Sequence, residues 1–361
     1  MKCSTIITIT SLIVILISYM YYNKINLAYT LPPPENIRKY SCQKASYTRL
    51  MEDFLKIDDN NLIACGANFK DFYAYFSIYN PDYQIKQGNL ALFDIRKNQF
   101  KTLEIKNFPK NLDFFPHGME LYKNKYIYVI NHSLNSKDGE RFEVLEIIKE
   151  KNDIKYLNYI RSIKLPDEFI GTTNGLTVAA EDDIFFSTSF PLHPPALDKA
   201  NYFNKKIFFM KVFVNYYLKL KMTNLYHYKN GKITKVNDSK SGCDNGLAYD
   251  EVNNLIFLAQ THENNIRVYK YEENNNIKFM RDIYLGYKVD NLFFDTKNRI
   301  LSAGIFGQGG YGGLAEIYPD KNFEVKIPFY DVINTSSATA MQINQKIYLV
   351  SPYVNYLLIC E

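Results

Sequence analysis

The sequence contains no tryptophan and only five cysteines, and neither sign of charge dominates it. Its 361 residues carry 43 basic and 38 acidic side chains, which gives a net charge of +5. This excess is too small for a nucleic-acid-binding protein, and no long basic run occurs in the globular part, so we expect no nucleic-acid partner. Five cysteines are also too few for a disulfide-stapled mini-domain. An apolar content of 47% argues against wholesale disorder.

The aromatic residues that are present favour β structure. The chain has 31 Tyr and 25 Phe, which suit half-buried pleated surfaces. Short apolar runs alternate with turn signals such as Asn230-Gly231. The clearest predicted strands are Asn61–Cys65, Leu90–Asp94, Tyr126–Asn131, Asp183–Thr188, Leu255–Gln260 and Ile347–Ser351. No long segment of helical period interrupts them, so we predict one all-β domain over residues 42–361.

The N-terminus predicts a membrane anchor. Residues 3–23 are uncharged and mostly apolar, and about 20 such residues span the hydrocarbon core of a bilayer. A cleaved signal peptide is the alternative, although no A-x-A-like cleavage site is evident. We expect residues 1–24 to form an uncleaved signal-anchor helix and residues 25–41, with their Pro run, to be a stiff spacer. The folded part would then lie in the ER lumen or outside the cell as a single-pass protein, with secretion less favoured.

Two further features bear on the compartment. Asn-x-Ser/Thr sequons occur at Asn131, Asn237 and Asn334, and we expect glycans at the last two. Cys42 and Cys360 bracket nearly the whole folded part. In an oxidising compartment they would tie the two ends together, but two unrelated thiols are an equal alternative from spacing alone.

A weak internal repeat predicts a β-propeller. Four polar motifs, separated by 46 to 71 residues, each precede an apolar strand: Pro116–Met119, Thr173–Leu176, Asp244–Leu247 and Asp290–Leu292. Blades of about 40 to 50 residues, lengthened by loops, produce such spacing. We predict six blades, with seven as an alternative. Because the inner strand of each blade begins at the central channel, the repeated polar residues should converge there.

The converging residues are oxygen donors. Asn174, Asn245, Asp290 and Asn291 lie at the repeat positions, and the pair Glu52-Asp53 lies in the first blade. Carboxylate and amide oxygens suit a hard cation such as calcium, whereas zinc and copper prefer nitrogen and sulfur. Each dipeptide alone is also a common turn sequence. Their recurrence at equivalent positions favours a metal site.

Two histidines fall in the same part of the repeat. His117 and His132 are 15 residues apart, which fits one strand, a turn and the return strand. An imidazole titrates near neutral pH and can act as a general base towards water, although a lone His is more often structural. His193, His227 and His262 carry no comparable argument, and we expect the last two to be exposed.

Taken together, residues 42–360 resemble the serum paraoxonase/arylesterase family of calcium-dependent six-bladed β-propeller hydrolases. The resemblance rests on the order and spacing of short motifs and not on long identical runs. These motifs are Met51–Leu55, Phe115–Gly118, Val129–His132, Asn174, Asp244–Gly246, Val289–Asn291 and the ending Leu357–Glu361.

The resemblance implies a hydrolase of lactones and aryl esters, with organophosphate triesters as a promiscuous extension. It implies one catalytic calcium ion, held by Glu52, Asn174, Asn245, Asp290 and Asn291. It further implies that His117, oriented by His132, activates the attacking water. A disulfide between Cys42 and Cys360 would join the first and last strands.

One departure from the family pattern affects the metal count. The family usually has an Asp directly after the ligand Asn, but Gly175 follows Asn174 here. Asp53 therefore loses a partner, and a second, structural calcium at Asp53 stays an open expectation. A non-catalytic paraoxonase-like chaperone or assembly factor, with a membrane protein as its client, is the alternative function.

Residues 201–224 form a second candidate membrane contact. They contain five lysines and no acidic residue, interleaved with aromatic and aliphatic side chains. Such a basic amphipathic segment predicts a helix at a lipid surface, while a blade strand with solvated lysines is the alternative.

Overall fold

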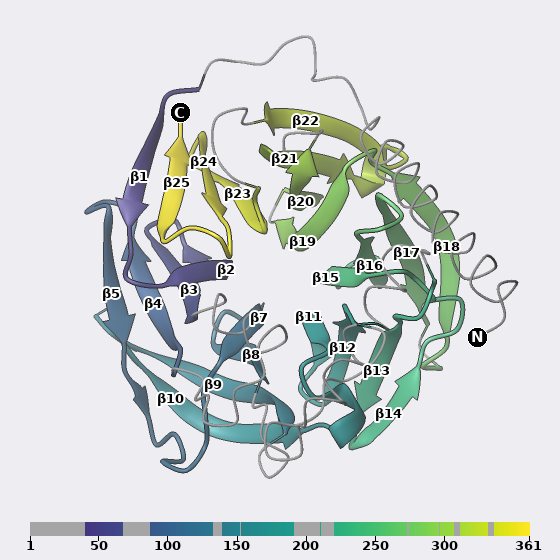
Figure 1. Cartoon of the computed structure of the whole chain (residues 1–361), viewed down its shortest axis with the longest axis horizontal. Coiled ribbons are helices and arrows are strands. Elements are labelled where there is room, and N and C mark those ends of the chain that lie inside the picture. The colour runs from purple at the N-terminus through teal and green to yellow at the C-terminus, as the bar shows by residue number, and fades with distance from the viewer. Residues whose placement is uncertain are drawn as a thin grey trace, which may run out of the picture.

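The computed structural model describes residues 40–67, 87–132, 139–151, 153–190, 210, 220–272, 274–295, 297–306, 311–330 and 336–361. Nearly all regular structure in these residues is β-strand, in six sheets arranged around a central axis (Figure 1). This confirms the predicted six-bladed β-propeller. Asp183–Thr188 and Leu255–Gln260 are strands with the predicted bounds, and the other named strands differ by one or two residues at their ends.

Each sheet is one blade. The strands nearest the central axis are β2, β7, β11, β15, β19 and β23 (Figure 1). Blade 1 consists of β2 (Leu50–Asp58), β3 (Asn61–Ala67), β4 (Asn89–Asp94) and β5 (Gln99–Leu103). Blade 2 consists of β7 (Pro116–Tyr122), β8 (Tyr126–His132), β9 (Glu140–Glu150), β10 (Asp153–Lys164) and the short outer β6 (Ile105–Lys106). Blade 3 consists of β11 (Thr173–Ala180), β12 (Asp183–Thr188), β13 (Leu225–Lys229) and β14 (Lys232–Lys235).

The remaining blades follow the same order. Blade 4 consists of β15 (Asp244–Asp250), β16 (Leu255–Gln260), β17 (Asn265–Tyr271) and β18 (Ile277–Tyr284). Blade 5 consists of β19 (Lys288–Asp295), β20 (Arg299–Phe306), β21 (Tyr311–Tyr318) and β22 (Glu324–Tyr330). Blade 6 consists of β23 (Thr339–Ile343), β24 (Lys346–Val350), β25 (Tyr356–Cys360) and β1 (Cys42–Ser46).

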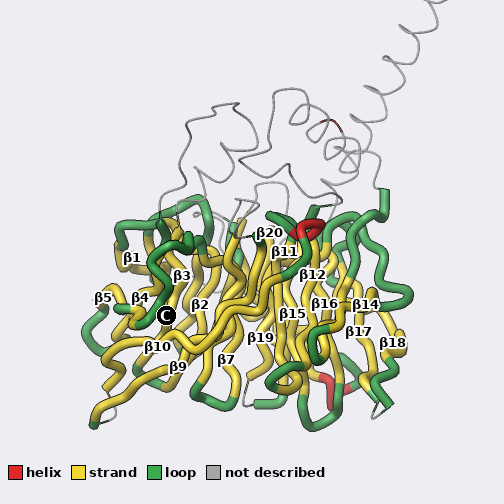
Figure 2. Tube along the Cα trace, turned by 90° about the horizontal axis from the view of Figure 1, so that it is seen from below, coloured by secondary structure: helices red, strands yellow, loops and turns green. Residues whose placement is uncertain are grey.

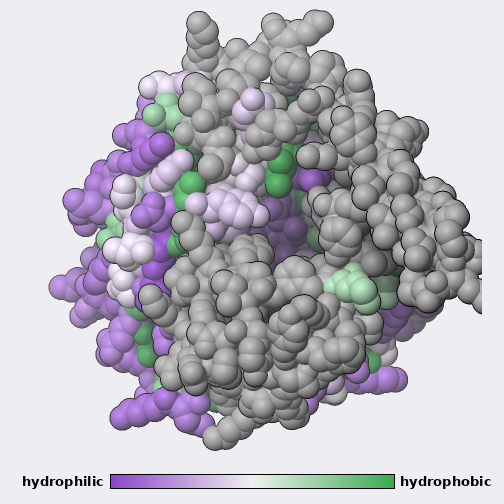
Figure 3. Space-filling model, viewed as in Figure 1, coloured by the Kyte–Doolittle hydropathy of each residue, from purple (hydrophilic) through white to green (hydrophobic). Residues whose placement is uncertain are grey.

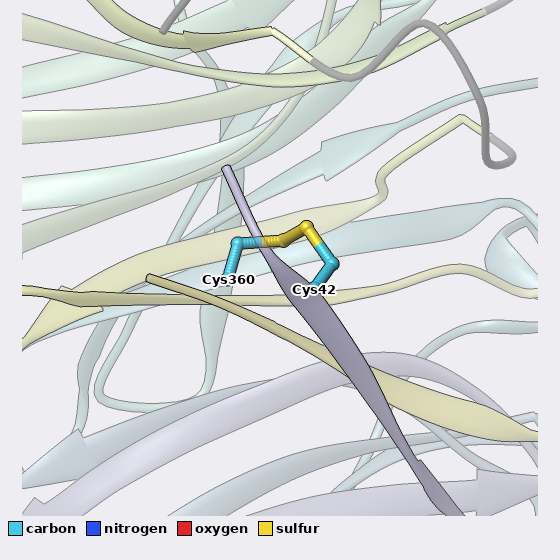
Figure 4. Close-up of a disulfide and its surroundings, with 2 residues drawn as sticks. All are labelled: Cys42 and Cys360. Carbon is cyan, nitrogen blue, oxygen red and sulfur yellow. A yellow bond between two sulfur atoms is a disulfide. The ribbon is translucent and has the colours of Figure 1, made fainter. Parts of the chain in front are cut away.

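Blade 6 closes the ring by joining both ends of the folded part. β1 pairs antiparallel with β25, and Cys42 lies directly opposite Cys360. A disulfide links these two residues (Figure 4). The bond confirms the pairing that the family resemblance implied. It covalently fixes the closing strand pair, so the first and last strands cannot separate without breaking it.

Apolar side chains fill the space between neighbouring blades. Leu55 and Ile63 of blade 1, for example, share a buried cluster with Ile127 and Val129 of blade 2. The middle strands β12 and β16 are buried along their whole length, whereas the outer β18 is mostly exposed. This explains why middle strands read as continuous apolar runs and outer strands as mixed ones. Side-on, strands occupy most of the height of the disc and loops lie at both faces (Figure 2).

Some predictions lie partly or wholly outside the described residues. They concern the anchor helix at 1–24, most of the spacer at 25–41, most of the basic segment at 201–224 and the sequon at Asn334. No helix within the described residues is long and apolar enough to cross a membrane. On the face seen in Figure 3, the described part of the outer rim is mostly hydrophilic.

Candidate active site

A bulge at the start of the inner strand positions the candidate residues in five of the six blades. In each case two residues of the inner strand lie opposite one residue of its partner strand. The bulged pairs are Glu52-Asp53, His117-Gly118, Asn174-Gly175, Asn245-Gly246 and Asp290-Asn291. Bulges redirect side chains and are frequent beside active sites. The register of blade 6 is regular at this point, and that blade contributes none of the predicted ligands.

Three oxygens of the predicted metal ligands are buried and lack a hydrogen-bond partner among the described residues. They are Glu52 Oε2, Asn174 Oδ1 and Asn245 Oδ1. Buried acceptors are normally satisfied, because an unpaired polar atom carries a desolvation penalty. A hard cation would satisfy all three, and carboxylate and amide oxygens are the donors that it prefers. The residues present therefore fit a calcium-type ion.

The other two predicted ligands adjoin Glu52. Asn291 Nδ2 donates to Glu52 Oε1 at 2.9 Å, so this amide presents its nitrogen to the carboxylate and holds it in place. Burial, followed by the charges of Glu52 and Asp53, raises the pKa of Asp290 well above its ordinary value, while a hydrogen bond with Asn245 opposes the rise. Crowded carboxylates with raised pKa values in a buried centre are an arrangement that a cation would relieve. Since amides supply most of the oxygens, the described residues contain no metal-binding group of three or more His, Cys, Asp and Glu side chains.

Asp53 has a different environment from Glu52. Its Oδ1 accepts hydrogen bonds from the Phe54 amide and the Thr339 hydroxyl, both at 2.8 Å, and its Oδ2 accepts one from the Met119 amide at 2.8 Å. Asp53 thus connects blades 1, 2 and 6. Burial and the neighbouring Glu52 charge raise its pKa to about 7.

Glycines let the inner strands approach one another closely below the ligands. A Cβ at Gly118 would lie 2.3 Å from the Asn174 carbonyl oxygen, and a Cβ at Gly175 would lie 2.7 Å from that of Asn245. Both distances are far shorter than any ordinary contact, and the obstacle is backbone. An Asp in place of Gly175 would therefore not fit without moving two blades. This packing gives Gly175 a structural reason, separate from any question about a second calcium.

A small cavity lies on the axis beside the candidate ligands, next to the residues that follow them along the inner strands. Its volume is about 20 Å³, room for about one water molecule or ion, and its lining includes Asp53, Gly175, Glu120 and Thr339. Burial and the Asp53 charge raise the pKa of Glu120 to about 8.

The two candidate histidines form a hydrogen-bonded chain with a buried glutamate. His117 Nδ1 lies 2.7 Å from His132 Nε2, and His132 Nδ1 lies 2.7 Å from Glu140 Oε1. Glu140 Oε2 accepts the backbone N–H of Gly171 at 2.9 Å, and the Thr173 hydroxyl also donates to Oε1. At the other end of the chain, His117 Nε2 lies 3.5 Å from Glu52 Oε2. The predicted histidine pair and the predicted ligand cluster therefore meet at one point.

Electrostatics link the two groups. Burial is the largest single influence on the pKa of His117 and would lower it, but the charge and hydrogen bond of Glu52, with the charges of Asp53 and Glu140, together outweigh burial and raise the pKa above its ordinary value. The negative charge of Glu52 thus strengthens the binding of a proton to His117.

Two supporting residues were not predicted from the sequence. Glu140 carries no motif, and its only signal is that it begins the strand after His132. Thr339 begins the inner strand of blade 6, and its hydroxyl contacts Asp53, the Glu52 carbonyl oxygen and the Asn291 amide. A search for the sixth member of the repeat would have pointed to Thr339.

The prediction for His227 was wrong. His227 is buried, its Nε2 lies 2.7 Å from Asp183 Oδ1, and its ring stacks on Phe185. His262 is only partly exposed. The sequence offered no periodicity that reveals this buried network, because Asp183 is far from His227 along the chain and meets it only through strand pairing.

The sequons differ in exposure. Asn131 is fully buried, and its side chain forms hydrogen bonds with Phe115, Asp113 and Glu143. It therefore has no room for a glycan in the folded protein. Asn237 is exposed in the turn after β14.

The chain is similar in sequence to curated serum paraoxonases. Human serum paraoxonase/lactonase 3 is 25% identical over 234 residues, which cover 63% of this chain and 58% of that protein. Chicken serum paraoxonase/arylesterase 2 is 24% identical over 243 residues, covering 65% of this chain and 60% of that protein. The chain thus spans about 60% of the length of the curated relatives that it matches.

Solved structures show the same fold. A putative gluconolactonase superposes with a TM-score of 0.53 at 12% identity, covering 92% of this chain and 97% of that one. Regucalcin from Agrobacterium tumefaciens, a calcium-binding protein, superposes with a TM-score of 0.51 at 10% identity, covering 89% and 93%.

The arylesterase family model matches residues 73–357, most of the propeller. Together with the relatives above, this match shows that the chain belongs to the arylesterase family, whose curated members include the serum paraoxonases.

Proposed function

We propose that this protein is a calcium-dependent hydrolase of lactones and aryl esters, with its active centre on the propeller axis. The observation that carries the proposal is the meeting of two groups. Buried oxygens without partners from blades 1, 3 and 4 lie next to a Glu–His–His chain from blade 2. The names of the relatives, paraoxonase, arylesterase and lactonase, support an ester or lactone as substrate.

Glu52, Asn174, Asn245 and Asp290 would hold the ion, and Asn291 and Thr339 would hold Glu52 in position. When bound, calcium would polarise the substrate carbonyl and stabilise the developing oxyanion.

The chain from Glu140 fixes where the protons lie. An ionised Glu140 accepts the proton on His132 Nδ1, so His132 Nε2 must accept from His117 Nδ1. This leaves the lone pair of His117 on Nε2, the atom that faces Glu52 and the channel. His117 Nε2 would take the proton of the attacking water, and His132 and Glu140 would stabilise the resulting imidazolium. Neutralising the Glu52 charge removes the main cause of the raised His117 pKa and keeps this nitrogen available as a base.

Turnover of phenyl acetate and of a γ-lactone by the purified full chain tests the proposal. We expect hydrolysis that a calcium chelator abolishes and added calcium restores, and that His117→Gln lowers strongly while calcium remains bound. A folded, calcium-loaded protein that hydrolyses no ester or lactone would refute the enzyme and favour the chaperone or assembly function.

We also propose that the propeller lies in the ER lumen or outside the cell, anchored through residues 3–23. The disulfide between Cys42 and Cys360 supports an oxidising compartment. The exposed Asn237 gives a direct test, since a glycosidase-sensitive mass that Asn237→Gln reduces would place this face in the secretory pathway. A cytosolic protein in cell fractionation would refute this placement.

A further inference from the structure

A row of polar side chains crosses blade 4 away from the central axis. Asp244 begins β15, Gln260 ends β16 and Asn265 begins β17. Asp244 pairs with Gln260 and Gln260 pairs with Asn265 in the strand register. Residues directly opposite one another in adjacent strands point to the same face of a sheet. The three side chains therefore share one face, and Gln260 Nε2 donates to Asp244 Oδ1 at 3.2 Å.

That face looks towards blade 3. Leu258, two residues before Gln260 in β16, and Tyr269, four residues after Asn265 in β17, belong to a buried cluster with Leu225 of blade 3. Since side chains alternate along a strand, Gln260 and Asn265 lie on the same side as these neighbours. The row is therefore enclosed between two blades and does not open into the channel lined by the candidate ligands.

Each member of the row has an unsatisfied oxygen. Asp244 Oδ2, Gln260 Oε1 and Asn265 Oδ1 are buried and have no hydrogen-bond partner among the described residues. Asp244 and Gln260 are fully buried, and Asn265 is 8% exposed. Native proteins leave only a few such atoms per hundred residues, so three side by side in one row call for an explanation.

The segment before β13 closes this space from the side of blade 3. The Thr223 hydroxyl accepts the backbone N–H of Asp244 at 3.1 Å, which brings this segment against the start of β15. Leu225, two residues further on and therefore on the same face, packs against Leu258 and Tyr269 of blade 4.

Charge favours a cation over an anion at this position. Asp244 supplies a carboxylate, and the nearby Glu263 adds negative potential while its own oxygens are held by Ser241 and Gly242. Arg267 lies two residues after Asn265, on the same face of β17. Its side chain donates hydrogen bonds to Asp282 and to the Asp238 carbonyl oxygen, so its positive charge is already paired. One carboxylate with two amide oxygens, and no imidazole in the row, suits a hard cation and not zinc or copper.

We propose that blade 4 holds a second calcium-type ion, at its interface with blade 3, through Asp244, Gln260 and Asn265. The site is distinct from the axial cluster and does not depend on the proposed hydrolase activity. Because Asn245 follows Asp244 directly, an ion here would fix the start of the strand that carries one of the axial ligands.

Counting bound calcium in the full chain tests the proposal. Equilibrium dialysis should give one calcium more per chain for the wild type than for Asp244→Asn, a change that keeps side-chain size. Glu52→Gln should lose a different equivalent, so the double variant should lose two. An equal count in the wild type and Asp244→Asn would overturn the proposal.

The variant Gln260→Glu gives a test that does not require Asp244→Asn to fold. If a cation occupies the row, a second carboxylate should tighten calcium binding by roughly tenfold and increase the rise in Tm on adding calcium. If a water molecule or nothing fills the space, two buried carboxylates should lower Tm, and calcium should not restore it. The second result also overturns the proposal.

Discussion

Replacing Glu140 by glutamine should abolish most of the activity without removing a single heavy-atom contact. Glu140 is fully buried and touches His132 through Oε1 and the Gly171 backbone N–H through Oε2. Glutamine has the same shape but replaces one acceptor oxygen by an NH₂ donor. The question is which of the two positions that donor takes.

The structure answers it. The Gly171 N–H is a fixed backbone donor at 2.9 Å, so an NH₂ group cannot face it. The NH₂ group must take the Oε1 position, where the Thr173 hydroxyl can rotate to accept. It then donates to His132 Nδ1, which moves the His132 proton to Nε2 and the His117 proton to Nε2. The atom that should accept the proton of water is then already protonated.

We therefore expect kcat of Glu140→Gln to fall by roughly 10²–10⁴-fold, the contribution of a general base held in the right tautomer. The assay is phenyl acetate hydrolysis by the calcium-loaded full chain across a range of pH. Glu143→Gln is the matched control. Glu143 is equally buried on the same strand, and it bonds Asn131 and Ser162 but neither histidine.

The control should leave kcat within about threefold of the wild type, because it changes no contact of the proton chain. Full activity in Glu140→Gln would refute the tautomer argument. Equal losses in both variants would show that removing either buried carboxylate lowers activity, and would not implicate the histidine chain in particular.

Three further predictions concern stability. Replacing Cys42 and Cys360 together by serine should lower the free energy of unfolding by about 5 kcal/mol in urea titrations, since the bond closes a loop over 318 positions; an unchanged midpoint would contradict this. Gly175→Ala should cost about 1–3 kcal/mol and lower Tm, because its Cβ would lie 2.7 Å from the Asn245 carbonyl oxygen. Burial acts to raise the pKa of Asp183, but hydrogen bonds from its histidine, lysine and tyrosine neighbours outweigh it and lower the pKa from 3.8 to about 2. Asp183→Asn should therefore lower the free energy of unfolding by about 2 kcal/mol more above pH 4 than near pH 2, because the ionised Asp183 stabilises the folded state only at the higher pH. A difference in unfolding free energy between the wild type and this variant that stays constant from pH 4 to pH 2 would refute the assignment.

The sequence predicted the candidate metal ligands only in part. The repeated dipeptides identified Asn174, Asn245 and Asp290-Asn291 as equivalent positions, because a propeller returns the chain to its axis once per blade. The sequence did not indicate that each dipeptide sits in a β-bulge, since bulging depends on how two residues face one on the partner strand. Nor did it indicate that Asn291 presents its nitrogen to Glu52, which is decided by the contacts around it.

At Gly175 the sequence suggested an interpretation that the structure replaces. Compared with the family pattern, which has an Asp at this position, the glycine suggested the loss of a carboxylate ligand. The reason for a glycine there is the backbone of the neighbouring blade, 70 residues further along the chain at Asn245.

The sequence by itself determined the all-β architecture, a propeller repeat and the residue types at the axis, because these follow from local strand patterns and their spacing, whereas the structure decided between six and seven blades. Tertiary structure alone decided the partners. Glu140 behind His132, Thr339 behind Asp53, Asp183 beside His227 and the row across blade 4 are joined by strand pairing or blade packing. Such contacts depend on register and on the distance between blades, and a periodic pattern along one chain specifies neither.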